Sequence, residues 1–310
     1  MTGFDPSALD PRTLDLKSVG VVERVLLAGA EANRSASCRQ GSVDRIEPPG
    51  RLIATGDLHD NPLHFARLVE HAGLSPEQDL SPDQKKGERS HLVLHEVIHP
   101  DTLMNGMDFS YRALARVAAL KAAHPELVHV LLANHELSQI VGAGIVKDGV
   151  RVVEAFNAGV EYVFGEDSPR VTEAIRVFVR SMPIALRCVT PSGDLLVAHS
   201  VPGLAAMNRF DASILSRDLT EEDYEPRRGS AHLMVWGRGY DDEQLEDLVE
   251  RWGVNLFVLG HEKVPEGARL IPPNAIVLNS DHERGMYLPL DLADLPTPEQ
   301  ALAMARPLAQ

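Results

Sequence analysis

The spacing of apolar and polar residues changes repeatedly along the chain from about residue 51 onward. Short apolar runs, typical of buried strands, alternate with longer segments in which apolar residues recur at helical spacing. The expected strands are residues 51–55, 91–94, 128–132, 184–189, 195–198, 256–259 and 275–278. The expected helices are residues 62–72, 109–124, 168–182 and 242–252. This alternation predicts an α/β fold built from layers of strands and helices.

The first fifty residues have a different pattern. Helical apolar spacing over residues 14–32 predicts a helix, and the polar residues 33–50 predict a loop before the main domain. We therefore expect an N-terminal helical extension and loop (1–50), a main domain (51–292) and a C-terminal tail (293–310). Within the main domain, the turn residues 191–194 predict a hairpin between two of the later strands.

Composition narrows the class of protein. The chain has 310 residues, of which 44% are hydrophobic and 24% charged, as in an ordinary folded protein. Its net charge of -15 argues against a nucleic acid or an anionic membrane as the main partner. No apolar run approaches the ~20 residues of a membrane span, and an acidic N-terminus broken by Pro6 and Pro11 is unlike a signal peptide. We expect a cytoplasmic protein without membrane contact.

Cysteine and histidine usage points to different chemistry. Cys38 and Cys188 lie far apart, outside any spacing typical of a disulfide framework or a thiolate zinc site. Thirteen histidines are more informative, because histidine serves both as a metal ligand and as an acid or base near neutral pH.

Polar residues suited to metal binding follow five of the expected strands. In order along the chain they are Asp57 and His59, Glu96, Asn134 with His135, His199, and His261. The loops beyond the carboxyl ends of strands form the binding crevice in open α/β sheets, so these side chains are expected to converge. Mixed oxygen and imidazole ligands suit manganese, iron or zinc better than calcium or magnesium. Two such ions about 3.5–4 Å apart can hold a bridging hydroxide and clamp the oxygens of a phosphoryl group.

The same ordered set of motifs resembles a known family. Residues 56–59 (Gly-Asp-Leu-His), 94–96 (Leu-His-Glu), 133–136 (Ala-Asn-His-Glu), His199 and 260–261 (Gly-His) resemble the calcineurin-like metallophosphoesterase superfamily, closest to its phosphoprotein phosphatase branch, over about residues 51–289. The resemblance implies a four-layer αββα sandwich with mixed sheets. It also implies hydrolysis of a phosphomonoester by a hydroxide held between two metal ions. The implied partner is a phosphorylated protein, with phosphoserine or phosphothreonine leading, or a small phosphate ester.

The resemblance also implies a role for each matching residue. Asp57 and His59 would bind the first metal ion, and Glu96 would stand at the bridging position. The second ion would be bound by Asn134, His199 and His261. His135 falls on the position of the general acid that protonates the leaving alkoxide, and an imidazole of ordinary pKa about 6.5 suits that task.

One segment departs from the family pattern. Where the family has an Asp at the bridging position, an Asp that orients the general acid and an Arg that binds phosphate, this chain has Glu96, His99 and Pro100. Arg238, between two glycines, is the replacement that we expect to bind phosphate, and Arg209 is a second candidate. The departures leave an alternative function open: a catalytically weakened relative that binds a phosphorylated ligand or partner.

Two further patterns bear on the function. Residues 95–99 match the H-E-x-x-H zinc motif of metalloproteases, but that motif needs a helix, whereas here a strand precedes it and Pro100 follows. An insertion at residues 142–167 contains Phe156, Tyr162 and Phe164, and fits either a lid or wall over the site or a packed surface excursion.

Overall fold

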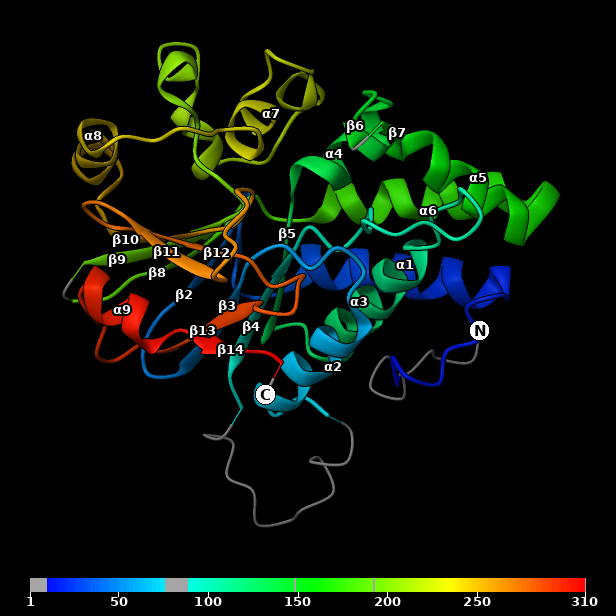
Figure 1. Ribbon diagram of the computed structural model, residues 1–310, viewed down its shortest axis with the longest axis horizontal. Helices are drawn as coiled ribbons and strands as arrows, with labels where there is room; N and C mark the ends of the chain where they lie inside the picture. The colour runs from blue at the N-terminus through cyan, green and yellow to red at the C-terminus, as the bar shows by residue number, and fades with distance from the viewer. Residues whose placement is uncertain (1–9, 76–88, 148, 192, 310) are drawn as a thin grey trace.

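Two mixed β-sheets form the centre of the molecule (Figure 1). The computed structural model describes residues 10–75, 89–147, 149–191 and 193–309. The first sheet has the strand order β1-β2-β8-β9-β10-β12-β11, and the second has the order β14-β13-β3-β4-β5. The strands of the first sheet are β1 (Arg39–Gln40), β2 (Val43–Ile46), β8 (Ala185–Cys188), β9 (Asp194–Ala198), β10 (Val254–Leu259), β11 (Ala268–Ile271) and β12 (Ala275–Leu278). Those of the second are β3 (Arg51–Thr55), β4 (His91–His95), β5 (Val128–Leu131), β13 (Met286–Asp291) and β14 (Arg306–Pro307).

The two sheets pack face to face through alternate side chains of their strands. Leu52 and Val93 of the second sheet belong to the same buried cluster as Leu186, Val197 and Val258 of the first. Because successive side chains of a strand point to opposite faces, the intervening residues are left for the outer faces. Parallel and antiparallel neighbours occur in both sheets, as expected for mixed sheets.

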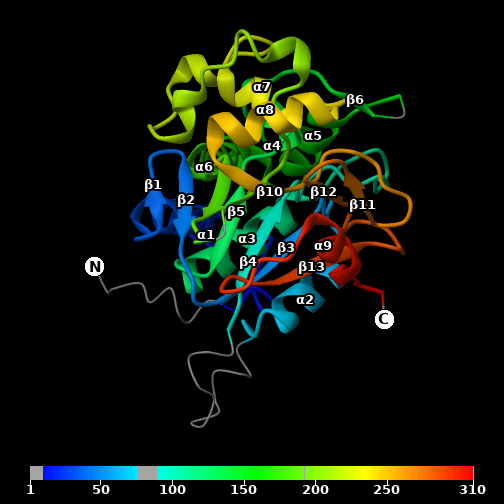
Figure 2. The same cartoon turned by 90° about the vertical axis from the view of Figure 1, so that its left-hand side faces the viewer.

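Helices cover the outer faces of the sandwich. One apolar cluster contains Leu92 and Leu94 of β4, in the second sheet, and Phe257 of β10, in the first, together with Leu245 and Leu248 of α8 and residues of other helices. Figure 2 shows α7 and α8 on one side of the sheets and α2 on the other. The helices are α1 (Val19–Ser35), α2 (Pro62–His71), α3 (Tyr111–Ala123), α4 (Asn134–Val141), α5 (Val152–Phe164), α6 (Ser168–Ser181), α7 (Ser230–Val235), α8 (Asp242–Trp252) and α9 (Pro298–Met304). The expected four-layer αββα sandwich is confirmed.

The segment 33–50 is not the loop that its polar composition predicts. It contains β1 and β2, and β2 pairs in parallel with β8 at the edge of the first sheet. The prediction was wrong because two of the four residues of β2 are charged, and the partners that allow Asp44 to be buried, Arg39 and His129, are not recognisable from local sequence. Segments on both sides of the expected boundaries at 50 and 292 thus belong to the sheets, since β14 pairs with β13.

The insertion after α4 has two parts. A short hairpin of β6 (Val146–Lys147) and β7 (Val150–Arg151) comes first, followed by α5. Phe156 and Phe164 of α5 are buried in the core. The helical part of the insertion is therefore packed on the molecule, and the hairpin is the part that remains available to the site.

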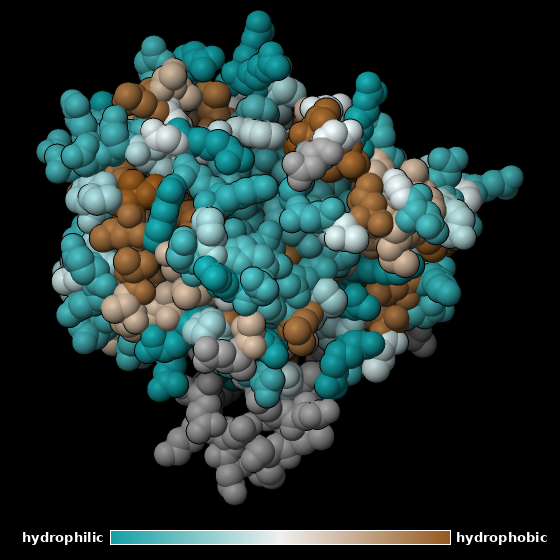
Figure 3. All heavy atoms as spheres, in the orientation of Figure 1, coloured by the Kyte–Doolittle hydropathy of each residue, from teal (hydrophilic) through white to brown (hydrophobic). Residues whose placement is uncertain are grey.

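No helix in the described parts of the chain is both long enough and apolar enough to cross a membrane. Figure 3 shows hydrophilic side chains over the middle of the face seen in Figure 1, and apolar residues in separate groups toward its left and right.

Candidate metal centre

The carboxyl ends of five strands meet at one edge of the sandwich. β3, β4 and β5 of the second sheet and β9 and β10 of the first end there, each followed by residues that the sequence singled out. Asp57 forms single-residue parallel bridges with His95, at the end of β4, and with Asn279, just after β12. The backbone of Asp57 therefore joins the two sheets, and the predicted site lies at this junction.

The backbone at this junction is strained. His59, Glu96 and His261 have φ angles of 43°, 48° and 68°, and Asp60 and His99 are also left-handed. Non-glycine residues in this region cost of order 1–3 kcal/mol each and cluster at functional sites. Such conformations persist only where surrounding contacts fix them.

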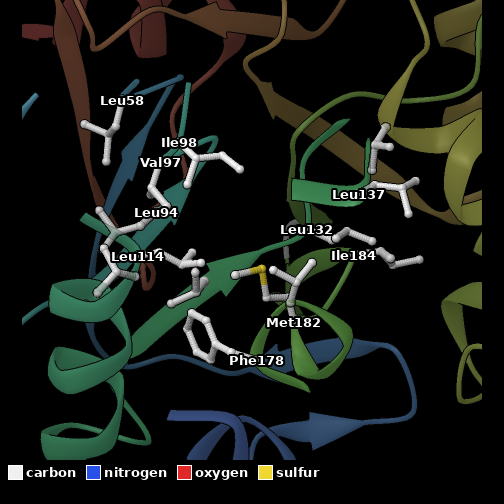
Figure 4. Packing of buried hydrophobic residues seen from close by; sticks show 14 of the residues in the cluster. Leu58, Leu94, Val97, Ile98, Leu114, Leu132, Leu137, Phe178, Met182 and Ile184 are labelled. Carbon is white, nitrogen blue, oxygen red and sulfur yellow. The ribbon is translucent and has the colours of Figure 1, made fainter. Parts of the chain in front are cut away.

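Buried apolar side chains supply those contacts. Leu58, Val97 and Ile98 alternate with the polar residues of the site and are buried; Figure 4 shows them close to Leu94 and Leu114. The loops are also tied together, because the N–H groups of Leu58 and His59 both donate to the Glu96 carbonyl, at 3.0 and 2.8 Å.

A first group of possible ligands forms around Glu96. His59 Nε2 lies 3.1 Å from Glu96 Oε1, and His135 Nε2 lies 3.8 Å from the same oxygen. His59 Nδ1 is 3.0 Å from the Ile98 carbonyl, which can only accept, so Nδ1 carries a proton. Nε2 is therefore the nitrogen that a metal ion would bind, in place of the proton that this ring shares with Glu96.

A second group surrounds His199. Its Nε2 lies 2.7 Å from Asn134 Oδ1, 2.8 Å from Glu96 Oε2 and 3.0 Å from His261 Nδ1. All four residues are buried, and oxygen atoms and imidazole nitrogens that face one another in this way can share a proton or a metal cation.

His95 explains which nitrogen of His199 faces that group. His95 Nε2 donates to the Thr55 carbonyl at 2.8 Å, so its Nδ1 carries a lone pair. His199 Nδ1, 3.1 Å away, is then the donor to His95 Nδ1, so Nε2 is the nitrogen that His199 presents to the second group. The donor set fits a metal ion at this position, with His199 bound through Nε2.

The two carboxylates of the junction are in different electrostatic states. Burial, with a contribution from Glu96, raises the pKa of Asp57 to about 7. Burial also opposes ionisation of Glu96, but His135 and His199 and the hydrogen bonds from His59 and His199 hold its pKa well below the ordinary value. In return, Glu96 outweighs burial and raises the pKa of His59 to about 9. Glu96 is thus the anion around which the neighbouring imidazoles gather.

The general-acid candidate, His135, opens α4 beside this anion. Burial lowers the pKa of His135 to about 3. The next residue, Glu136, accepts from the backbone N–H groups of Val97 and Ile98 at 2.7 and 3.3 Å. Glu136 therefore supports the loop that carries Glu96.

The site opens into a cleft of about 760 Å³. Asp57, His59, Glu96, Asn134, His135 and His261 line it, and the buried His199 lies directly behind them. The basic side chains that line it among the described residues are Lys147, Arg238 and Lys263. Arg238 Nη2 is 3.5 Å from His261 Nδ1. Arg209, the second candidate for phosphate binding, instead contacts the Arg227 carbonyl and is not among the lining residues.

The H-E-x-x-H pattern at residues 95–99 has no helix. His95 ends β4, and Glu96 and His99 have left-handed backbone. The two imidazoles also have different partners, Thr55 and His199 for His95 and Asp108 for His99. The segment therefore lacks the helix that the metalloprotease motif requires.

A separate buried group consists of Cys38, Asp44 and His129. Asp44 already accepts from Arg39 and His129, both at 2.7 Å, and burial raises the pKa of the Cys38 thiol to about 12. A protonated thiol and a fully paired carboxylate are poor metal ligands. This group is an internal polar network.

Sequence reasoning missed three residues around the site. His95 orients His199, Lys147 of the β6–β7 hairpin lines the cleft, and Asp108 lies behind His99. His95 stands next to a predicted ligand at a strand end, which was a usable signal. Lys147 and Asp108 lie in loops and carry no local pattern that points to the site.

Comparison with known proteins gives similarity at the level of structure. No protein-family description and no curated protein matches the sequence. The structure is similar to that of a protein serine/threonine phosphatase from Saccharomyces cerevisiae, with a TM-score of 0.63 and 14% identity over 94% of each chain. It is also similar to a cold-active protein tyrosine phosphatase of a psychrophilic Shewanella species, with a TM-score of 0.53 and 16% identity over 84% of this chain and 81% of that one. The chain therefore has the fold of these phosphatases, and its buried clusters of His, Asp and Glu at the sheet junction could hold metal ions.

Proposed function

We propose that the protein is a metal-dependent phosphoesterase that hydrolyses a phosphomonoester. The observation that carries the proposal is the convergence of six possible ligands from five strand ends, at the base of a cleft that also holds basic side chains. The structural similarity to two phosphatases supports the same class of reaction.

The resemblance of the motifs assigns two overlapping ligand sets: Asp57, His59 and Glu96 would hold one ion, and Glu96, Asn134, His199 and His261 would hold the other. The structure groups Glu96 with His199 and His261 as this assignment requires, whereas His59 and Glu96 are grouped with His135, and Asp57 with His95 and His199. Divalent ions bound there supply Lewis acidity and lower the pKa of a coordinated water. The mixture of oxygen and imidazole donors favours manganese, iron or zinc.

The remaining residues of the cleft would bind and orient the phosphate ester. Arg238 and Lys147 lie on the cleft wall, where each can donate to phosphoryl oxygens. His135 would donate a proton to the leaving group from Nε2. Because burial lowers the pKa of His135, we expect aryl esters, whose leaving groups need less protonation, to react faster than alkyl esters.

Metal content and turnover, measured on the same preparation, test the proposal. We expect two tightly held ions by elemental analysis and hydrolysis of para-nitrophenyl phosphate, with phosphoserine and phosphotyrosine peptides compared as protein-like substrates. Asp57→Asn and His261→Ala should each reduce turnover at least about 100-fold while the far-UV circular dichroism stays unchanged. The exposed Asp294→Asn is the matched control. Near-full activity in either site variant would contradict the assignment of the metal ligands.

The second candidate function is binding without efficient turnover. It is favoured by the segment after β4, which has His99 and Pro100 where the related motif has an aspartate and an arginine. A folded protein that holds one ion or none, binds a phosphopeptide and hydrolyses none of the three substrates would support this function over the first.

A further inference from the structure

A second cavity, of about 390 Å³, lies apart from the candidate metal centre. Its lining residues come from the carboxyl-terminal ends of α1 and α6, from the turn between β1 and β2, and from the segment 218–224. Figure 2 shows β1 and β2 beside α1 and α6 at the side of the molecule. Among the described residues, this cavity and the cleft share no lining residue. Any ligand of the cavity would therefore bind away from the metal centre.

Guanidinium groups dominate the charge of this cavity. Arg34, Arg39 and Arg180 line it, and the acidic residue that lines it within the described parts of the chain is the exposed Asp218. The chain as a whole carries a net charge of -15, so the arginines form a local positive region on an acidic protein. Such a region attracts anions, because the nearest charges dominate the local field.

Arg39 is held firmly, yet one of its nitrogens is unused. Its Nε donates to Asp44 Oδ1 at 2.7 Å, and its Nη1 donates to the Ser181 carbonyl at 3.0 Å. Its Nη2 is buried and has no hydrogen-bond partner. Because buried donors rarely lack a partner, this nitrogen is free to donate to a ligand oxygen after a small movement of the surrounding side chains.

The other two arginines are held loosely and can turn toward a ligand. Arg180 pairs through Nη1 with Glu221, whose side chain is 78% exposed, and an exposed ion pair of this kind contributes only ~0–1 kcal/mol. The Nε of Arg180 is buried without a partner. Arg34 is exposed, and its Nη2 makes a long hydrogen bond of 3.4 Å to the Val177 carbonyl. A ligand can therefore recruit both side chains at little cost.

The geometry of the donors selects the chemical class of the ligand. A planar carboxylate has two oxygens, whereas a phosphate group presents its oxygens in several directions and can accept from three guanidinium groups at once. Met182, Leu219 and Tyr224 also line the cavity and offer apolar surface to an organic group. Arg180 already lies over the Tyr224 ring, with its Cζ 5.0 Å from the ring centroid. The volume falls within the range of small-molecule pockets.

We propose that this arginine-lined cavity binds a small organic phosphomonoester as its dianion, at a site separate from the metal centre. Arg39 would provide the fixed donor, and Arg34 and Arg180 would close on the phosphate oxygens. The organic group would lie against Met182 and Leu219. The proposal does not depend on the hydrolase function, because none of these residues belongs to the metal centre.

Calorimetric titration of metal-free protein with phenylphosphonate tests the site, because this dianion cannot be hydrolysed. We expect Arg34→Ala and Arg180→Ala each to weaken binding at least about tenfold, the equivalent of one charge-assisted hydrogen bond. Arg170→Ala, which removes the same charge from an exposed position of α6, should change the affinity less than about twofold. Arg34 is exposed, so its variant should fold even if Arg180→Ala does not.

Three results would overturn the proposal. The first is the absence of binding by the wild-type protein. The second is binding that is lost in Arg238→Ala but kept in Arg34→Ala and Arg180→Ala, which would place the probe in the cleft. The third is equal affinity for phenylphosphonate and benzoate, which would rule out selection of a phosphate group. We expect inorganic phosphate to bind more weakly than phenylphosphonate, and equal affinities would contradict the contact with an organic group.

A nuclear magnetic resonance measurement locates the probe directly. In arginine-labelled, metal-free protein, the Nε–H signal of Arg180 is identified by its loss in Arg180→Ala. We expect this signal to shift when phenylphosphonate is added to the wild type, and to need at least about ten times more probe for the same shift in Arg34→Ala. An Arg180 signal that stays in place at saturating probe would show that the ligand binds elsewhere.

Discussion

The Glu96 carboxylate contacts residues of both groups of candidate ligands. Its Oε1 faces His59 and its Oε2 faces His199, so one side chain serves both ligand groups. Glutamate is one methylene longer than the aspartate of the related motif, and its backbone here is left-handed, with a φ of 48°. The charge of Glu96, more than its length, is what holds the imidazoles together.

Substitutions at Glu96 separate charge from length. We expect Glu96→Gln to lose at least one of the two metal ions and most of the turnover, because an amide cannot neutralise two cations. We expect Glu96→Asp to keep both ions and at least about a third of the activity, since it keeps the charge. Elemental analysis and para-nitrophenyl phosphate hydrolysis measure both quantities. Two ions bound by Glu96→Gln as firmly as by the wild type would show that Glu96 is not shared.

Because Gly260 has no side chain, His95 and Asp57 can pack directly against its backbone. A Cβ atom at this position would lie 2.4 Å from His95 Cε1 and 2.5 Å from Asp57 Oδ1. Gly260→Ala must therefore displace a proposed ligand or the residue that orients His199. We expect a loss of about 1–3 kcal/mol in the free energy of unfolding, as for other overpacked sites, together with weaker metal binding.

Gly144→Ala is the matched control for Gly260→Ala, because a Cβ atom at Gly144 meets nothing within 4 Å. Denaturant titration and metal titration of both variants provide the comparison. If Gly260→Ala unfolds and binds metal like Gly144→Ala, the close approach at Gly260 has no role in the site.

At the scale of elements, the β6–β7 hairpin is the part of the insertion that reaches the cleft. Ile145, Val146 and Lys147 line the cleft, while α5 is packed into the core through Phe156. Lys147 Nζ lies 2.6 Å from Asp101 Oδ1 and 3.5 Å from His59 Nε2. The hairpin thus brings a cation to the edge of the proposed metal centre.

Removal of this cation should affect substrate binding more than the chemical step. We expect Lys147→Ala to raise KM for para-nitrophenyl phosphate about tenfold, the equivalent of one charge-assisted hydrogen bond, and to change kcat by less than about threefold. Lys17→Ala, an exposed residue far from the cleft lining, is the control. A change confined to kcat would mean that Lys147 does not bind the phosphate ester.

Elements differ in how well local sequence predicts them. The strands 51–55 and 275–278 were predicted with the observed bounds, because buried strands are continuous apolar runs with turn signals on either side. β13 was missed because Pro289 interrupts it and half of its residues are only partly buried. β2 was missed because its charged residue, Asp44, is buried only through partners elsewhere in the chain.

The same distinction applies to the candidate site. Ligands that follow a strand could be predicted, because topology alone brings the carboxyl ends of strands together. The place of His95 at a strand end was also a usable signal, although its contact with His199 is made only in the folded chain. Asp108 could not be predicted, since its contact with His99 is made only in the folded chain and no local pattern marks it.

At the scale of the whole molecule, buried aspartates connect the two sheets at two places. Asp57 does so at the cleft through its backbone bridges. Asp44 of β2, in the first sheet, accepts at 2.7 Å from His129 of β5, in the second, and also from Arg39. Burial opposes ionisation of Asp44, but His129 and Arg39 hold its pKa well below the ordinary value. The contact of Asp44 with His129 is a polar link across an otherwise apolar interface.

This link should make a measurable and pH-dependent contribution to stability. We expect Asp44→Asn to lower the free energy of unfolding by about 3 kcal/mol at pH 7, because it leaves Arg39 and His129 buried without their anion. The folded-state pKa of Asp44 lies below the unfolded-state value of about 3.9, so its stabilisation is fully present above that pH and is lost as the pH falls toward the folded-state pKa. Between about pH 4 and 2.5 the wild type should therefore lose stability more steeply than the variant. Urea titrations at several pH values in this range measure both slopes. Parallel pH dependence in the two proteins would mean that Asp44 is not the ionised link between the sheets. If instead their free energies of unfolding converge as the pH falls, the ionised Asp44 carboxylate is the source of the difference between them at pH 7.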